Sequence, residues 1–150
     1  MRNKEVRLYN VLFPLWFLMI FPAAWLIVLP GNFLIDSLVL LISLRVLKIA
    51  DRKSWYKRHI LPIFGFGMLA DVIGAAFLFL MMILEVYDIR NELLLTIPAL
   101  LISAGLIFVF NYFVTFRRAE KKTRLRLALA FAIATAPYTF LIPTGWVYGF

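Results

Sequence analysis

Residues 60–84 read ILPIFGFGMLADVIGAAFLFLMMIL, and this stretch decides the class of the fold. Among its 25 residues Asp71 is the only charged one. A helix of that length extends about 37 Å, whereas about 20 apolar residues already cross the roughly 30 Å hydrocarbon core of a bilayer. The stretch therefore predicts a transmembrane helix.

Similar apolar blocks lie on both sides of this stretch. Of the 150 residues, 64% are apolar, whereas soluble domains have about 45–50%. Pro30-Gly31-Asn32 separates the first two blocks and predicts a tight turn between antiparallel helices. We expect an all-α, polytopic membrane protein in which residues 1–150 form a single transmembrane domain. The five expected spans cover approximately residues 8–29, 33–49, 60–84, 93–116 and 127–148.

The basic residues lie in short clusters between these blocks. With the amino terminus placed in the cytoplasm, 15 of the 16 Lys and Arg residues fall on the inner side, and Arg90 alone falls outside. Short cytoplasmic loops of membrane proteins carry an excess of Lys and Arg. The pattern predicts a cytoplasmic amino terminus, an external carboxyl terminus and insertion in a bacterial cytoplasmic membrane.

The net charge of +8 would suggest nucleic-acid binding in a soluble protein. Here no basic stretch is long enough to form a nucleic-acid-binding domain, so we expect no nucleic-acid partner. Basic and aromatic residues at the inner span ends suit anionic lipid headgroups instead. The residues expected to make these contacts are Lys48, Trp55, Lys57, Arg58, Arg117 and Arg118.

The side chains of common catalytic and metal sites are scarce. The chain has no cysteine and one histidine, His59, which excludes thiolate sites and sites with several histidines. No glycine-rich phosphate loop, Ser-His-Asp set or Asp-rich metal motif is visible. We therefore expect no enzymatic activity, no cofactor and no metal.

Asp71 is the most informative single residue. It lies 11 residues beyond Ile60, or roughly 16 Å into the span and close to the bilayer midplane. A charged Asp there costs about 2.5–3.5 kcal/mol on insertion scales. Two interpretations stay open. Asp71 either forms a hydrogen bond to a neighbouring helix within a packing seam, or it is a site for a proton, a cation or a substrate.

Three other polar residues are candidates for a ligand or ion pathway. Asp36 is expected in the first turn of the second span, near the outer surface, where a carboxylate suits the helix dipole. Asp36 and Asp71 should therefore lie at different depths. Arg45 can extend to phosphates at the inner surface or bind a specific headgroup. Asn111 is expected to make a hydrogen bond between helices.

Small residues at three- and four-residue spacing predict close helix contacts, within the chain or between copies of it. Pro137 should kink the fifth span and free backbone carbonyls that could line a cavity. The small residues expected at helix contacts are Gly67, Ala70, Gly74 and Ala75 in the third span, and Ala128, Ala132 and Ala136 in the fifth.

Two functions fit these features. The first is a homo-oligomeric transporter, channel or lipid-handling protein that uses the midplane carboxyl of Asp71. The second is a non-catalytic accessory, assembly or immunity subunit of a larger membrane complex. The surroundings of Asp71 distinguish them, because a transport site requires a cavity and a subunit contact requires only a dry helix seam.

Overall fold

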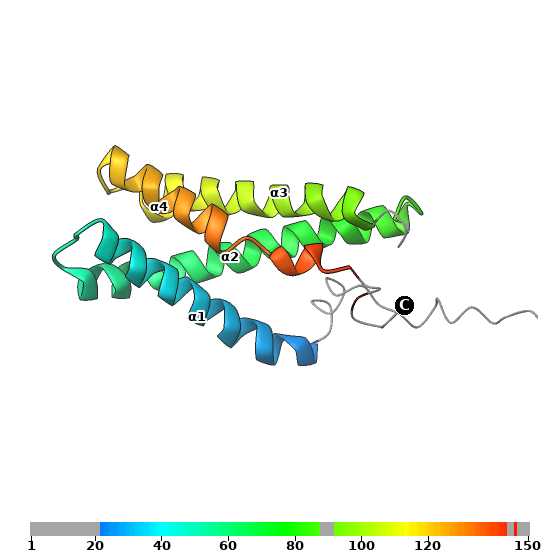
Figure 1. Cartoon of the computed structure of the whole chain (residues 1–150), viewed down its shortest axis with the longest axis horizontal. Helices are drawn as coiled ribbons and strands as arrows, with labels where there is room; N and C mark the ends of the chain where they lie inside the picture. The colour runs from blue at the N-terminus through cyan, green and yellow to red at the C-terminus, as the bar shows by residue number, and fades with distance from the viewer. Residues whose placement is uncertain (1–21, 88–91, 144–145, 147–150) are drawn as a thin grey trace, which may run out of the picture.

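The computed structural model describes residues 22–87, 92–143 and 146, and all regular elements in these ranges are helical (Figure 1). An all-helical architecture is therefore confirmed for this part of the chain. The elements are α1 (Pro22–Val46), α2 (Arg52–Ile83), α3 (Glu92–Phe110), a π-helical turn η4 (Asn111–Thr115) that continues α3, α4 (Lys121–Ala134) and a 3₁₀ turn η5 (Tyr138–Leu141).

Three helices of the described part are long and apolar enough to cross a membrane. They comprise 25 residues in α1, 32 in α2 and 24 from Glu92 to Thr115. Large apolar side chains stand exposed along each of them, for example Leu26 with 79% of its surface accessible. Such surfaces are unfavourable in water and suit contact with lipid. These three helices are therefore typical of a membrane protein.

The predicted turn at Pro30-Gly31-Asn32 is wrong, because α1 continues through these three residues. Pro30 costs the helix one hydrogen bond, to the carbonyl of Leu26. Membrane helices tolerate such a loss, since a helix still satisfies the remaining backbone groups. Packing also holds the segment, because Asn32 Nδ2 donates to Met68 Sδ of α2 at 3.1 Å.

This correction changes the first two predicted spans. Residues 22–29 and 33–46 belong to one helix, so the predicted first span keeps only residues 8–21 as a separate stretch. Fourteen residues extend about 21 Å as a helix, less than the roughly 30 Å hydrocarbon core. Most of that predicted span, with residues 1–21, lies outside the described residues.

The predicted fifth span is also not one continuous helix over its described part. α4 ends at Ala134, and the chain resumes as the short turn η5 at Tyr138. Pro137 causes the break, because in a continuous helix its ring would clash with the carbonyl of Ile133 and it has no N–H to donate to that carbonyl. The carbonyl of Ile133 instead accepts a hydrogen bond from the Tyr138 hydroxyl.

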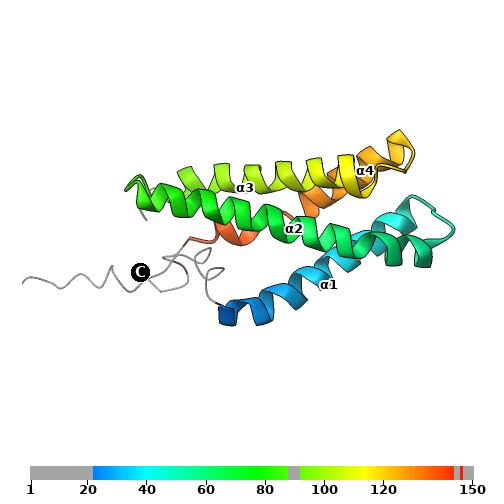
Figure 2. The same cartoon turned by 180° about the vertical axis from the view of Figure 1, so that it is seen from behind.

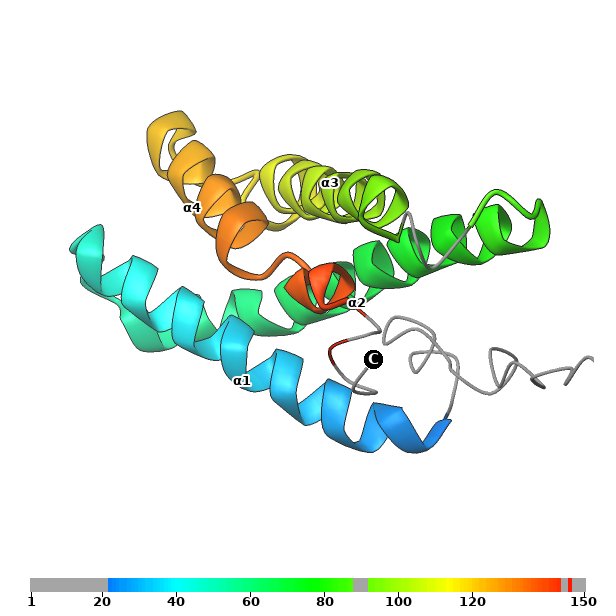
Figure 3. The same ribbon diagram turned by 45° about the vertical axis from the view of Figure 1, so that its right-hand side comes forward.

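Helix α2 occupies the centre of the bundle and contacts both α1 and α3. Figures 1 and 2 show α2 and α3 side by side, whereas the amino-terminal part of α1 diverges from α2 (Figures 2 and 3). The core cluster joins all four long helices. Its fully buried members include Leu40, Leu44, Ile63, Ile107 and Phe131.

The small residues of α2 allow α3 to approach closely. The Ser103 hydroxyl of α3 donates to the carbonyl of Ala70 at 3.0 Å. One turn further along α2, a Cβ at Gly74 would overlap Ser103 Oγ and would lie 3.2 Å from the carbonyl oxygen of Ala99. The predicted contact residues Ala70, Gly74, Ala75, Ala128 and Ala136 are buried, and Gly67 and Ala132 are half-buried.

Candidate functional site

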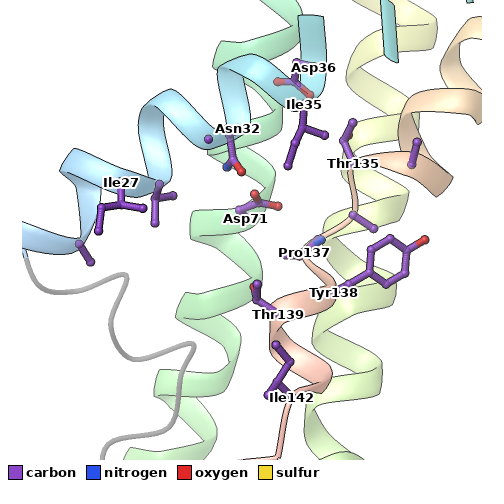
Figure 4. Close-up of a pocket in the computed structure, with 15 residues that line it drawn as sticks. Ile27, Asn32, Ile35, Asp36, Asp71, Thr135, Pro137, Tyr138, Thr139 and Ile142 are labelled. Atoms are coloured by element: carbon purple, nitrogen blue, oxygen red, sulfur yellow. The ribbon is translucent and has the colours of Figure 1, made fainter. Parts of the chain in front are cut away.

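A cavity of about 560 Å³ lies between α1, α2 and the broken segment that follows α4 (Figure 4). Its described walls come from residues 24–36 of α1, from Asp71 of α2 and from residues 134–142. The divergence of α1 from α2 and the break before η5 together leave this space. Both features depend on packing between segments that lie far apart in the sequence.

Two carboxyl groups line this one cavity. Asp36 and Asp71 come from neighbouring helices, and only 4% and 5% of their respective surfaces are exposed. A Cβ at Gly67 would lie 3.7 Å from Asp36 Oδ2. Gly67 precedes Asp71 by one helical turn, so the Asp36 carboxyl packs against α2 about one turn from Asp71.

This arrangement corrects the sequence-based expectation about the position of Asp36. The residue lies near the middle of the 25-residue helix α1 rather than in the first turn of a span. Its carboxyl also lines the same cavity as Asp71, although no sequence pattern indicated that the two carboxyls belong to one site. The error follows from the turn predicted at Pro30-Gly31-Asn32, which would have moved Asp36 to the end of a helix.

The Asp71 carboxyl has an unused hydrogen-bond acceptor. Its Oδ1 atom is buried and has no hydrogen-bond partner in the described part of the structure. Burying a polar atom without a partner costs about 1–3 kcal/mol, so Asp71 reduces the stability of the fold unless something else occupies the cavity.

The ionisable side chains that line the described part of the cavity are all acidic. Among its described lining residues there are two Asp and no Lys or Arg. Two negative charges in apolar surroundings are costly unless a proton or another cation compensates them. The arrangement can therefore bind positive charge.

Sequence reasoning did not place three further polar residues in this cavity. Asn32, Thr135 and Thr139 line it. The sequence predicts a turn at Asn32, but its side-chain amide donates to Met68 Sδ of α2. The Thr135 hydroxyl donates to the carbonyl of Phe131 at 2.9 Å. The expectation that Pro137 interrupts the helix beside a cavity is confirmed, because the irregular segment around Pro137 lines this cavity.

Arg45 and Asn111, the other two pathway candidates, do not line the cavity. Arg45 is exposed in the last turn of α1. Asn111 is fully buried in η4, but its Nδ2 donates to the carbonyl of Ile107 at 2.9 Å, within its own helix. The expected hydrogen bond from Asn111 to another helix is therefore wrong for its amide nitrogen.

The basic clusters around residues 45–58 and 117–126 lie at the same end of the bundle (Figure 1). Lys48, Lys57, Arg58, Arg117 and Arg118 are exposed there. The half-buried Trp55 stacks on His59 with 4.7 Å between ring centroids. Arg124, at the same end, lies 4.2 Å above the Tyr112 ring and donates to its hydroxyl at 3.1 Å, a contact that the sequence did not predict.

Comparisons with protein-family models, with curated proteins and with solved structures each gave no significant match. The site is therefore characterised by its own geometry, which is a cavity within a helical membrane bundle, lined by two buried carboxyl groups and by a broken helix.

Proposed function

We propose that this chain is a small membrane transporter that binds a cation in the cavity between α1, α2 and residues 134–142. The observation that carries the proposal is the shared position of Asp36 and Asp71 in that cavity. Ionisable residues are rare within membrane spans and are typical of ion and proton pathways. A proton can take the place of the cation on the same carboxyls, and this exchange would couple cation movement to proton movement.

The break between α4 and η5 supports the same proposal. Transporters commonly form their binding sites from discontinuous helices, whose irregular backbone is tolerated where it lines a cavity. Here residues 134–139 line the cavity beside both carboxyls. Association into homo-oligomers stays a prediction from the small-residue stripes. Binding to another membrane protein also stays a prediction.

Proton movement in proteoliposomes tests transport. Purified protein is reconstituted with an internal pH-sensitive dye, and a potassium diffusion potential is imposed, with and without an opposing gradient of Na⁺ or methylammonium. We expect the wild-type protein to move protons under at least one of these gradients. Asp71→Asn and Asp36→Asn should reduce the rate to that of protein-free liposomes, because each removes one of the two carboxyls of the cavity.

Glu120→Gln provides a matched control, since Glu120 is an exposed carboxyl before α4 and outside the cavity. It should retain the wild-type rate. Wild-type rates equal to those of protein-free liposomes under every gradient would refute transport and favour the accessory-subunit alternative.

For orientation, we propose that the end carrying residues 45–58 and 117–126 faces the cytoplasm. The excess of Lys and Arg there supports this placement. The carboxyl terminus would then lie outside. The five-span arrangement with a cytoplasmic amino terminus remains a prediction, and it requires the chain to cross the membrane once more before α1.

Cysteine labelling in intact cells checks the orientation. The chain has no native cysteine, so each single-cysteine variant reports on one position only. An impermeant reagent should label Val86→Cys and should not label Lys53→Cys or Lys122→Cys. All three positions are exposed. Labelling of Lys53→Cys would reverse the orientation. Asn3→Cys reports separately on the amino terminus, and its labelling would reduce the number of spans to four.

A further inference from the structure

The lining of the cavity combines carboxyl groups with aliphatic side chains. Asp71 lies near Asn32, Asp36 lies further along α1 beside Ile35, and Ile27 and Ile142 lie away from Asp36 (Figure 4). Ile27 and Ile142 are both more than a third exposed. A ligand that enters this space therefore meets both carboxyl oxygens and aliphatic side chains.

The size of the cavity argues against a bare metal ion. Its volume of about 560 Å³ falls in the range of roughly 300–1,000 Å³ that is usual for small organic ligands. Hard cations such as Ca²⁺ take about 6–8 oxygen ligands at short distance. The described residues contain no group of three or more His, Cys, Asp or Glu side chains that could hold a metal.

We infer that the cavity binds an organic cation, whose positive group lies against Asp71 and Asp36 and whose apolar body contacts the aliphatic side chains of Ile27, Val28 and Ile142. This inference names the substrate class of the proposed transporter and rests on that proposed function.

The chemistry of the cavity selects the charge of the ligand. The Asp71 carboxyl lines the cavity and its Oδ1 atom has no hydrogen-bond partner in the described ranges, so a cation in the cavity would offset a negative charge that the protein leaves uncompensated. No Lys or Arg is present among the described lining residues to attract an anion. Ion pairs are stronger where the charged groups are shielded from water, and both carboxyls are buried.

Two probes of matched shape and opposite charge test the inference. Tetraphenylphosphonium and tetraphenylborate present the same four phenyl rings around a positive and a negative centre, respectively. Binding to the purified protein is measured in detergent, after subtraction of binding to protein-free micelles. We expect saturable binding of tetraphenylphosphonium and none of tetraphenylborate. Na⁺ and Ca²⁺ should not displace the bound cation.

Variants locate the binding. Asp71→Asn should weaken the binding of tetraphenylphosphonium by about tenfold or more, because removing one partner of a buried charge pair costs at least that much. Glu120→Gln, a carboxyl outside the cavity, should leave the binding unchanged. Equal binding of both probes, or an Asp71→Asn variant with wild-type affinity, would contradict the inference.

The outcome also separates this inference from the proposed transport. Proton flux that depends on Asp71, without binding of tetraphenylphosphonium, would overturn the organic-cation ligand and leave transport supported. Binding that depends on Asp71, without flux under any gradient, would support the ligand class and refute transport.

Discussion

Replacing Gly74 with alanine is expected to destabilise the protein by about 1–3 kcal/mol, the usual cost of overpacking a tight core. The new Cβ would overlap Ser103 Oγ, and it would come 3.0 Å from Phe140 Cε2 and 3.2 Å from the Ala99 carbonyl oxygen. Ser103 can rotate, but the Ala99 carbonyl belongs to the backbone of α3. Helix α3 would have to move away from α2, and the hydrogen bond from Ser103 to Ala70 would be strained.

Gly105→Ala is the matched control. Gly105 lies within α3, and a Cβ there would meet nothing within 4 Å. Alanine favours a helix over glycine by about 1 kcal/mol at either position, so the difference between the two variants isolates the close contact at Gly74. Thermal unfolding in detergent should give a lower midpoint for Gly74→Ala and an unchanged or higher one for Gly105→Ala. Equal midpoints would show that α2 and α3 are not packed as described.

Replacing Asp71 with leucine is expected to stabilise the protein while abolishing proton flux. The change removes a buried, unpartnered oxygen, whose burial costs about 1–3 kcal/mol. The adjoining cavity gives the leucine side chain space. Residues placed for function often cost stability, so that their replacement yields a more stable and inactive protein.

Asp71→Asn completes this test. Asparagine keeps the size of the side chain and removes its charge, so the variant should fold and remain monodisperse but lose flux. Thermal midpoints, gel-filtration profiles and flux are measured for both variants in parallel. A misfolded leucine variant together with a fully active asparagine variant would identify Asp71 as a structural hydrogen-bonding residue and exclude it as a cation site.

The sequence predicted the helical class and singled out the two carboxyl residues that line the cavity. The stretch around Asp71 was long and apolar enough for a membrane helix, and α2 contains all of it except the last residue, Leu84. Gly74 was recognised as a contact position because small residues spaced along a helix permit close approach. Asp36 and Asp71 stood out because charge is costly inside a bilayer.

The errors came from local signals that tertiary contacts overrode. Pro30-Gly31-Asn32 has the composition of a turn, but the segment remains helical and bonds Met68 through Asn32. Turn propensity amounts to a few kcal/mol at most, whereas a non-helical backbone in an apolar environment leaves several polar groups unsatisfied. The predicted start of the second span, and with it the position of Asp36 along its helix, is wrong for this reason.

The sequence by itself determined that the chain enters a membrane, because apolar length and the distribution of Lys and Arg are properties of single segments. Only the tertiary structure decided that Asp36 and Asp71 share one cavity, because that depends on how α1 crosses α2 and on where the chain breaks before η5. Crossing of helices is set by side-chain packing between distant segments, and no local pattern in the sequence records it.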